Sequence, residues 1–242
     1  KNAIVTGAAG LLGYEHTFAL LENGATVWML DIDKTKMEKS KKLLIKYFPE
    51  EFINTATVDI TREKDLLDFS KLLNNQGIRI DILINNAAID PKITGNIEDF
   101  ETSRLENFSL NEWNSQLNVG LTGAFLCSKI FGFKMSLDDK GGVILNIASD
   151  LSVISPDNRL YENKKLEDNL QPVKPIAYSV VKSGLIGLTK YLSTYWAKNK
   201  IRCNALSPGG VFNNQDDIFI QRLEQRIPMG RMANKDEYRS SI

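Results

Sequence analysis

The sequence predicts a doubly wound α/β fold, in which helices cover both faces of one parallel β-sheet. Short apolar runs typical of buried strands alternate with segments of helical periodicity along the 242 residues. A glycine-rich turn joins the first predicted strand to the first predicted helix. No internal repeat and no linker of biased composition divides the chain, so we expect one domain over residues 1–242.

The first third of the chain predicts four strands and three helices. Each predicted strand is a short run rich in Val, Ile, Leu or Ala, and each predicted helix spaces its apolar residues three or four apart. Gly24 ends the first helix at a position where a left-handed cap is usual. The predicted elements are strand 2–6, helix 12–23, strand 25–30, helix 34–47, strand 54–58, helix 62–76 and strand 80–84.

The rest of the chain continues the alternation with longer helices. Its predicted elements are helix 110–135, strand 143–147, helix 178–199, strand 201–206 and helix 218–226. The segments 89–108 and 150–176 are too long and too polar to be simple connections. Each follows a strand, so both leave the carboxyl edge of the sheet, where open α/β folds bind ligands. We expect substrate-side loops there, with surface decoration as the alternative.

Composition and charge exclude several kinds of partner. The 30 basic and 30 acidic side chains give a formal net charge of zero, which argues against nucleic acid or an anionic membrane as the main partner. No apolar run approaches the ~18 residues that cross a bilayer, and strand-like residues begin at Asn2, so neither a membrane span nor a signal peptide is expected. Cys127 and Cys203 stand alone in apolar surroundings, as reduced thiols of a cytoplasmic protein do. Because His16 is the only histidine, a histidine-based catalytic triad or a zinc site is nearly excluded, and no metal is expected.

The first strand runs into a glycine-rich turn and then into a helix. The turn reads Thr6-Gly7-Ala8-Ala9-Gly10-Leu11-Leu12-Gly13. Gly7 permits the tight turn, Gly10 lets the backbone approach a pyrophosphate, and Gly13 lets the helix pack closely on the strand. The helix N-terminus offers free N–H groups to the anion. This setting predicts a dinucleotide site, the alternative being a glycine-rich turn without a ligand.

Asp31 closes the second strand, 24 residues after Gly7. An acidic residue at this place binds the ribose hydroxyls of adenosine and repels a 2′-phosphate. Lys34 and Lys36 lie nearby in the sequence and would soften that repulsion. The expected cofactor is NAD, with NADP as the less favoured alternative.

Six further motifs follow at strand ends and on helices. They are Asp59-Ile60, Asn85-Asn86-Ala87-Ala88, the stretch from Trp113 through Asn118 to Phe125, Ile147-Ala148-Ser149, Tyr178-Ser179-Val180-Val181-Lys182, and Ser207-Pro208-Gly209. With the glycine loop and in this order, they resemble the short-chain dehydrogenase/reductase family over essentially the whole chain. The resemblance implies a Rossmann-type fold and an NAD(P)-dependent oxidoreductase that acts on alcohols and ketones.

The resemblance also implies roles for individual residues. The implied catalytic residues are Asn118, Ser149, Tyr178 and Lys182. The implied cofactor-binding residues are Thr6, Gly7, Gly10, Leu11, Leu12, Gly13, Asp31, Asp59, Ile60, Asn86, Ala87, Ala88, Tyr178, Lys182, Pro208, Gly209 and Val211.

Tyr178 and Lys182 lie four residues apart on a predicted helix and therefore share one face. Because an ammonium group stabilises a nearby phenolate, we expect Lys182 to lower the pKa of Tyr178 from about 10 toward the working range. Tyr178 would be the general base in oxidation and the general acid in reduction. Ser149 would orient the reacting oxygen, Lys182 would also hold the nicotinamide ribose, and Asn118 would anchor a proton-relaying water.

The chain departs from the family's usual pattern in four places. Leu11 stands where classical members have their second glycine, and Ala88 replaces a glycine. Ser149 and Tyr178 are 29 residues apart, so about half of the segment 150–176 is inserted. The family's final strand is missing after residue 242. These features indicate a sugar-sized substrate site and a similarity to bacterial oxidoreductases of surface-glycan and flagellin-modification sugar synthesis.

Basic residues of the second long loop would suit a phosphate or carboxylate on such a substrate, although loop cations are more often simply solvated. They are Arg159, Lys164, Lys165 and Lys174. Two other functions stay open. The glycine spacing and the long loop favour a nucleotide-sugar epimerase or dehydratase with tightly bound NAD. The same fold would also serve a non-catalytic NAD-binding regulatory protein.

Two predicted helices carry more apolar residues than one buried face needs. Over 117–133 and 185–196 these residues spread around more than one face, which indicates burial against something besides the sheet. Members of the family commonly pair through the corresponding helices. We therefore expect a homodimer or homotetramer, the alternative being that the two long loops cover the surplus.

Overall fold

The computed structural model describes residues 1–91 and 102–242. Its six parallel strands lie in the order β3-β2-β1-β4-β5-β6, which is the order of doubly wound dinucleotide-binding sheets. The strands are β1 (Asn2–Thr6), β2 (Thr26–Asp31), β3 (Ile53–Thr57), β4 (Ile82–Asn85), β5 (Gly142–Ile147) and β6 (Ile201–Leu206). The predicted fold class is confirmed.

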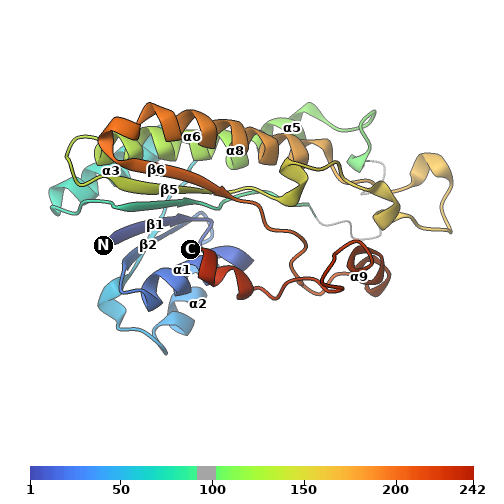
Figure 1. Cartoon of the computed structure of the whole chain (residues 1–242), viewed down its shortest axis with the longest axis horizontal. Helices are drawn as coiled ribbons and strands as arrows, with labels where there is room; N and C mark the ends of the chain where they lie inside the picture. Colours follow the sequence, from blue (N-terminus) through green and yellow to red (C-terminus); the bar gives the residue numbers. More distant parts are fainter. Residues whose placement is uncertain (92–101) are drawn as a thin grey trace.

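Helices cover both faces of this sheet (Figure 1). They are α1 (Leu11–Glu22), α2 (Lys34–Leu44), α3 (Glu63–Asn75), α5 (Leu110–Leu117), α6 (Gly123–Cys127), α7 (Phe133–Met135), α8 (Ile176–Tyr195) and α9 (Asp217–Glu224). The helices α1 and α2 lie on one face, and α3, α6 and α8 lie on the other. Within the described residues, none of the helices has the length and apolar character needed to span a membrane.

A hydrophobic core fills each face of the sheet. Because successive strand residues point to opposite faces, β1 contributes to both cores. Ile4 belongs to the core that contains Phe69 and Phe131. Its neighbours Ala3 and Val5 belong to the core beneath α1 and α2. Burial of β1 on both sides explains its apolar sequence.

The predicted helix 110–135 is helical throughout but not α-helical throughout. Two wider π-helical turns, Asn118–Thr122 and Ser128–Gly132, separate α5, α6 and α7. Each turn contains a glycine in close contact with a neighbouring element. A Cβ on Gly120 would lie 2.5 Å from Cγ1 of Val181, and a Cβ on Gly132 would overlap the ring of Trp196. These contacts join residues far apart in the sequence, which local helical periodicity cannot predict.

The segment 150–176 is held mainly by polar contacts. Arg222 of α9 donates from Nη1 to three backbone carbonyls between residues 159 and 162, at 2.7 to 3.3 Å. Arg226 donates from Nε to Asp157 at 2.8 Å. The helix α9 and this loop are therefore tied together beyond the carboxyl edge of the sheet (Figure 1).

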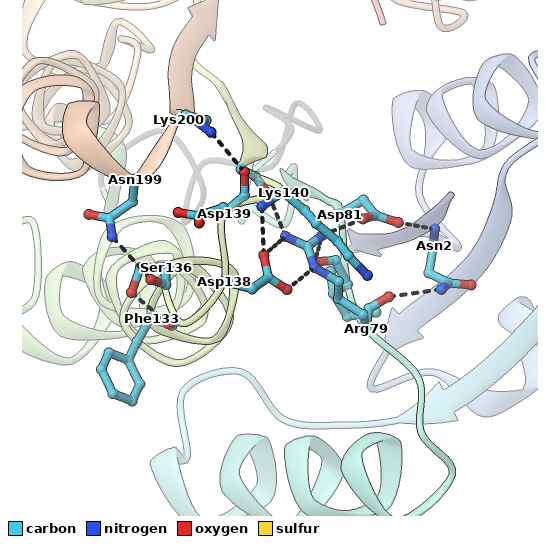
Figure 2. Close-up of polar contacts among 12 residues, drawn as sticks. Asn2, Arg79, Asp81, Phe133, Ser136, Asp138, Asp139, Lys140, Asn199 and Lys200 are labelled. Atoms are coloured by element: carbon cyan, nitrogen blue, oxygen red, sulfur yellow. Dashed lines mark hydrogen bonds and ion pairs between the residues drawn. The ribbon is translucent and has the colours of Figure 1, made fainter.

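An ionic cluster lies at the opposite edge of the sheet, where the strands begin (Figure 2). The Arg79 guanidinium donates to both oxygens of Asp138, at 2.8 and 2.9 Å, and also pairs with Asp81. Asp81 accepts a hydrogen bond from the backbone N–H of Asn2 at 2.8 Å, and the Asn2 side chain donates to the Arg79 carbonyl. These bonds link the start of β1 to the segments that precede β4 and β5.

Gly132→Ala is expected to lower the free energy of unfolding by about 1–3 kcal/mol, because the added methyl group meets the buried Trp196 ring. Equilibrium unfolding in urea measures the difference. Gly187→Ala on α8 is the matched control, since nothing lies within 4 Å of its added Cβ. The control should raise the unfolding free energy by roughly 0.5–1 kcal/mol. Equal stability of the two variants would contradict this account of the packing.

Candidate active site

The glycine loop is fixed by the turn that follows β4. The Thr6 hydroxyl accepts hydrogen bonds from the backbone N–H groups of Asn86 and Ala87, at 3.0 and 3.1 Å. The Asn86 amide donates to the carbonyls of Thr6 and Gly7, at 3.0 and 3.1 Å. Gly7 has φ of +61°, and a Cβ there would lie 2.8 Å from Ala87 Cα. The position therefore requires glycine.

The N-terminus of α1 has the features of an anion site. A Cβ on Gly13 would overlap the Gly7 carbonyl oxygen, so the helix packs on the loop as closely as its backbone permits. The N-cap residue Gly10 makes no side-chain cap, and no acidic side chain lies in the first turn. The N–H groups of Leu11 and Leu12 have no acceptor within the helix and point along its positive end. These residues fit the pyrophosphate of a dinucleotide.

The Asp31 carboxylate lies beside the glycine loop at the end of β2. Its Oδ2 accepts from the backbone N–H of Ala9 and its Oδ1 from that of Asp33, both at 3.0 Å. A carboxylate oxygen has a second lone pair, so both remain able to accept from ribose hydroxyls. Lys36 pairs with Asp33 at 3.3 Å. That lysine therefore has its own carboxylate partner, which limits the expected softening of the repulsion by Asp31.

Asp59 and Ile60 are held where the resemblance places an adenine contact. The Asp59 carboxylate accepts from the backbone N–H and the hydroxyl of Thr61, at 2.9 and 2.7 Å. Ile60 is buried, and a Cβ on Gly123 would lie 2.6 Å from its Cδ1. Asp59 thus stabilises its own turn, and Ile60 packs against the helix α6.

The turn after β6 lies next to the end of β5. The backbone N–H of Asp150 donates to the Pro208 carbonyl at 2.9 Å, and that of Gly209 donates to the Tyr238 hydroxyl at 3.1 Å. Val211 forms an isolated parallel bridge with the C-terminal segment. The predicted residues of this turn therefore lie at the same sheet edge as Ser149.

Three of the four predicted catalytic side chains meet beyond the end of β5. Tyr178 and Lys182 lie one turn apart on α8, and Ser149 is the second residue after β5. Lys182 is 5% exposed and donates from Nζ to the Ile147 carbonyl at 2.7 Å. Its Nζ lies 5.6 Å from the centroid of the Tyr178 ring. Ser149 is equally buried, and its hydroxyl acts on the Tyr178 phenol in the direction that favours the phenolate.

Burial controls the ionisation of these side chains. It raises the pKa of Tyr178 to about 12; the carboxylates of Asp90 and Asp150 act in the same direction, and hydrogen bonding to Ser149 opposes them. Burial lowers the pKa of Lys182 to about 8. The prediction that Lys182 lowers the pKa of Tyr178 is therefore wrong for the protein alone. Loss of water disfavours the charged forms of both groups, and it is the largest cause of both shifts.

Asn118 begins the first π-helical turn. Its carbonyl accepts from the backbone N–H of Gly123, five residues later, in place of the usual four. The Asn118 side chain is exposed. Within the described residues, no hydrogen bond joins it to Ser149, Tyr178 or Lys182. Wide turns of this kind are frequent at functional sites, so the π-helical turn supports a functional role for the Asn118 position.

The structure brings three charged residues to the site that the motifs did not include. Asp150 accepts a hydrogen bond from the Ser149 hydroxyl at 2.7 Å. Lys174 places its ammonium group 3.9 Å from the centroid of the Tyr178 ring and pairs with Asp90. Asp90 follows the turn after β4 and Asp150 follows Ser149, so adjacency to a motif was the available signal for both.

The four basic residues of the loop 150–176 have different surroundings. Arg159 is largely exposed and pairs with Asp157 at 2.9 Å. Lys164 and Lys165 are exposed. Of the four, Lys174 is the one whose ammonium group touches the candidate site. The predicted role in holding an anionic group is thus reduced to this single residue.

Comparisons with known proteins identify the family of the chain. A family model described as short chain dehydrogenase matches residues 1–161, and one described as enoyl-(acyl carrier protein) reductase matches residues 168–242. A D-threitol dehydrogenase of Mycolicibacterium smegmatis is 27% identical over 98% of this chain and 82% of its own length. A post-translational flagellin modification protein A of Campylobacter coli is 28% identical over 93% of this chain and 82% of its own length.

One longer relative and one solved structure also match over nearly the whole chain. An uncharacterized short-chain type dehydrogenase/reductase of Sinorhizobium fredii is 28% identical over 99% of this chain, which spans 39% of that relative. A crystal structure of a short chain dehydrogenase from Leptospira borgpetersenii with bound NAD+ is 30% identical, with a TM-score of 0.83. It covers 100% of this chain and 83% of its own.

Proposed function

The chain belongs to the short-chain dehydrogenase family, and we propose that it is an NAD-dependent oxidoreductase that interconverts a secondary alcohol and a ketone on a sugar-derived substrate. The observation that carries the proposal is the convergence of Ser149, Tyr178 and Lys182 at the sheet edge that also bears the glycine loop. The strands β1 and β5 both neighbour β4, so a dinucleotide on the loop would reach the catalytic side chains.

Tyr178 is the proposed acid and base. In oxidation its phenolate oxygen takes the proton of the substrate hydroxyl, and in reduction its phenol returns a proton to the carbonyl oxygen. When bound, the nicotinamide cofactor supplies the hydride acceptor or donor. Burial of the phenol keeps the proton on Tyr178 at neutral pH, so the residue is already in the form that reduction requires.

Ser149 and Lys182 position the reacting groups. The Ser149 hydroxyl donates to Asp150 and accepts from the backbone N–H of Leu151, which fixes its oxygen. Rotation of the O–H bond would exchange the Asp150 acceptor for the substrate oxygen. Lys182 uses one of its three N–H bonds on the Ile147 carbonyl, so the others remain for the nicotinamide ribose.

A sugar-derived substrate is supported by two observations. The loop 150–176 and α9 are joined by hydrogen bonds beyond the catalytic residues. Together they add protein surface that a large substrate could contact. The relatives named above include a dehydrogenase of a four-carbon polyol and a flagellin modification protein. The first of these acts on a substrate that carries several hydroxyl groups.

A panel of polyols, sugars and nucleotide-linked sugars should reveal a substrate whose oxidation with NAD+ produces NADH, followed by absorbance. Tyr178→Phe is expected to lower kcat by about 10²- to 10⁴-fold, because the proton acceptor is lost, while NAD+ affinity stays close to wild type. Tyr47→Phe, at an exposed tyrosine, is the matched control. Retention of activity by Tyr178→Phe would refute the assignment. Product formation without free NADH would instead favour an epimerase or dehydratase.

NAD is expected to bind more tightly than NADP, because the Asp31 carboxylate accepts ribose hydroxyls and repels a 2′-phosphate. Asp31→Ala should reduce this preference by about tenfold, a change of roughly 1.4 kcal/mol, measured by calorimetric titration of both dinucleotides. Asp68→Asn removes an exposed carboxylate on α3 instead, and should preserve the wild-type ratio. Equal affinity of the wild-type protein for both dinucleotides would contradict the role of Asp31.

The protein is expected to form a homodimer or homotetramer through α6, α7 and α8. Phe125 and Phe133 are exposed on α6 and α7, and the stacked rings of Tyr191 and Tyr195 are exposed on α8. Light scattering at micromolar concentration should report at least twice the 27.2 kDa of one chain. Phe133→Asp with Tyr195→Asp should shift the mass toward the monomer, whereas Leu67→Asp on α3 should not. A monomeric wild-type protein would refute this prediction.

A further inference from the structure

Lys174 and Asp90 form an ion pair against the ring of Tyr178. Lys174 Nζ lies 2.6 Å from Asp90 Oδ1 and 3.9 Å from the centroid of the ring. The Lys174 side chain is 12% exposed, whereas that of Asp90 is 56% exposed. The backbone N–H of Lys174 donates to Asn158 Oδ1 at 3.2 Å. The loop 150–176 therefore holds the lysine over the ring.

The two partners have opposite effects on the phenol. An ammonium group close to the ring is attracted to its π electrons, and it stabilises the negative phenolate more than the neutral phenol. A nearby carboxylate repels the phenolate. Because Asp90 follows β4 and Lys174 precedes α8, the fold brings both charges to Tyr178 from separate segments.

We propose that Lys174 and Asp90 are positioning residues that act through Tyr178 and set the pH at which it exchanges a proton with the substrate. The inference rests on the proposed role of Tyr178 as acid and base. Lys174 favours the phenolate and Asp90 favours the phenol. Since the two form one pair, removal of either leaves the charge of the other uncompensated.

Other polar or titratable groups face Tyr178 from the elements packed around it. They are Ser149 and Asp150 beyond β5, Lys182 on α8, and Tyr161 in the loop 150–176. Burial is the largest cause of the raised pKa of Tyr178, and Asp90 is the next. Asp90 also raises the pKa of Lys182, whereas Lys174 lowers it. Asp90 thus acts on both partners of the Tyr178–Lys182 pair.

The test is the pH dependence of kcat/KM for alcohol oxidation, which rises as Tyr178 loses its proton. Asp90→Asn should move the midpoint down by roughly one pH unit, because a repelling charge is removed and Lys174 is left unpaired. Lys174→Met should move the midpoint up by a similar amount. The double variant should return to within a few tenths of the wild-type midpoint.

A second readout needs no turnover. Absorbance titration of tyrosinate in the protein alone, with Tyr178→Phe subtracted, isolates Tyr178 from the other six tyrosines. Asp90→Asn should lower its midpoint. Lys174→Arg keeps a cation and should preserve the wild-type profile. Lys164→Met and Asp168→Asn change exposed charges in the same loop and serve as matched controls.

Opposite displacements of the midpoint by Asp90→Asn and Lys174→Met support the proposal. Unchanged midpoints, displacement in the same direction, or failure of Lys174→Arg to preserve the profile would overturn it. Failure of the proposed acid/base role is separately visible as activity retained by Tyr178→Phe. In that case the absorbance titration still decides whether the pair acts on the phenol.

Discussion

The close approach between the end of β1 and the turn after β4 is the constraint on which the site depends. Gly7 and Ala87 leave no room for a side chain between them, and the Thr6 hydroxyl and the Asn86 amide bond across the gap. The strand order reverses at this point, between the halves β3-β2-β1 and β4-β5-β6. A change in the approach would move the glycine loop and Asp31 relative to the strands that position the catalytic side chains.

A series of buried side-chain hydrogen bonds then connects the sheet to α8. The Asn85 amide donates to Asn146 Oδ1 at 2.8 Å, and the Asn146 amide donates to the Thr189 hydroxyl at 2.8 Å. Asn85 and Asn146 are paired in register on β4 and β5. Removal of one member would leave buried polar atoms without partners, which costs more than a surface hydrogen bond contributes. This series thus fixes how far along the sheet α8 presents Tyr178.

The sequence predicted those features that depend on local composition. The strand Asn2–Thr6 lies where predicted because its short apolar run specifies a buried strand, and Ile201–Leu206 because its apolar residues alternate with exposed polar ones. The helix 110–135 was predicted without its two π-helical turns, since these occur at glycines packed against distant residues. Lys174 was predicted as an anion ligand on charge alone. Its contact with the ring and with Asp90, 84 positions away, is a tertiary property that spacing does not contain.

The balance of charge around Tyr178 restricts how the site would work and on what. The carboxylates of Asp90 and Asp150 act on a phenol whose pKa burial raises to about 12, and the amino groups of Lys174 and Lys182 lie 3.9 and 5.6 Å from the centroid of its ring. With the side-chain charges nearly balanced, Tyr178 loses its proton most readily when further positive charge is adjacent, as the oxidised nicotinamide ring provides. Oxidation would then require the dinucleotide before proton transfer. A substrate with a phosphate or carboxylate near the reacting carbon would oppose that effect, because its negative charge raises the pKa of Tyr178 further. A neutral polyol or sugar, as proposed above, would leave the balance intact.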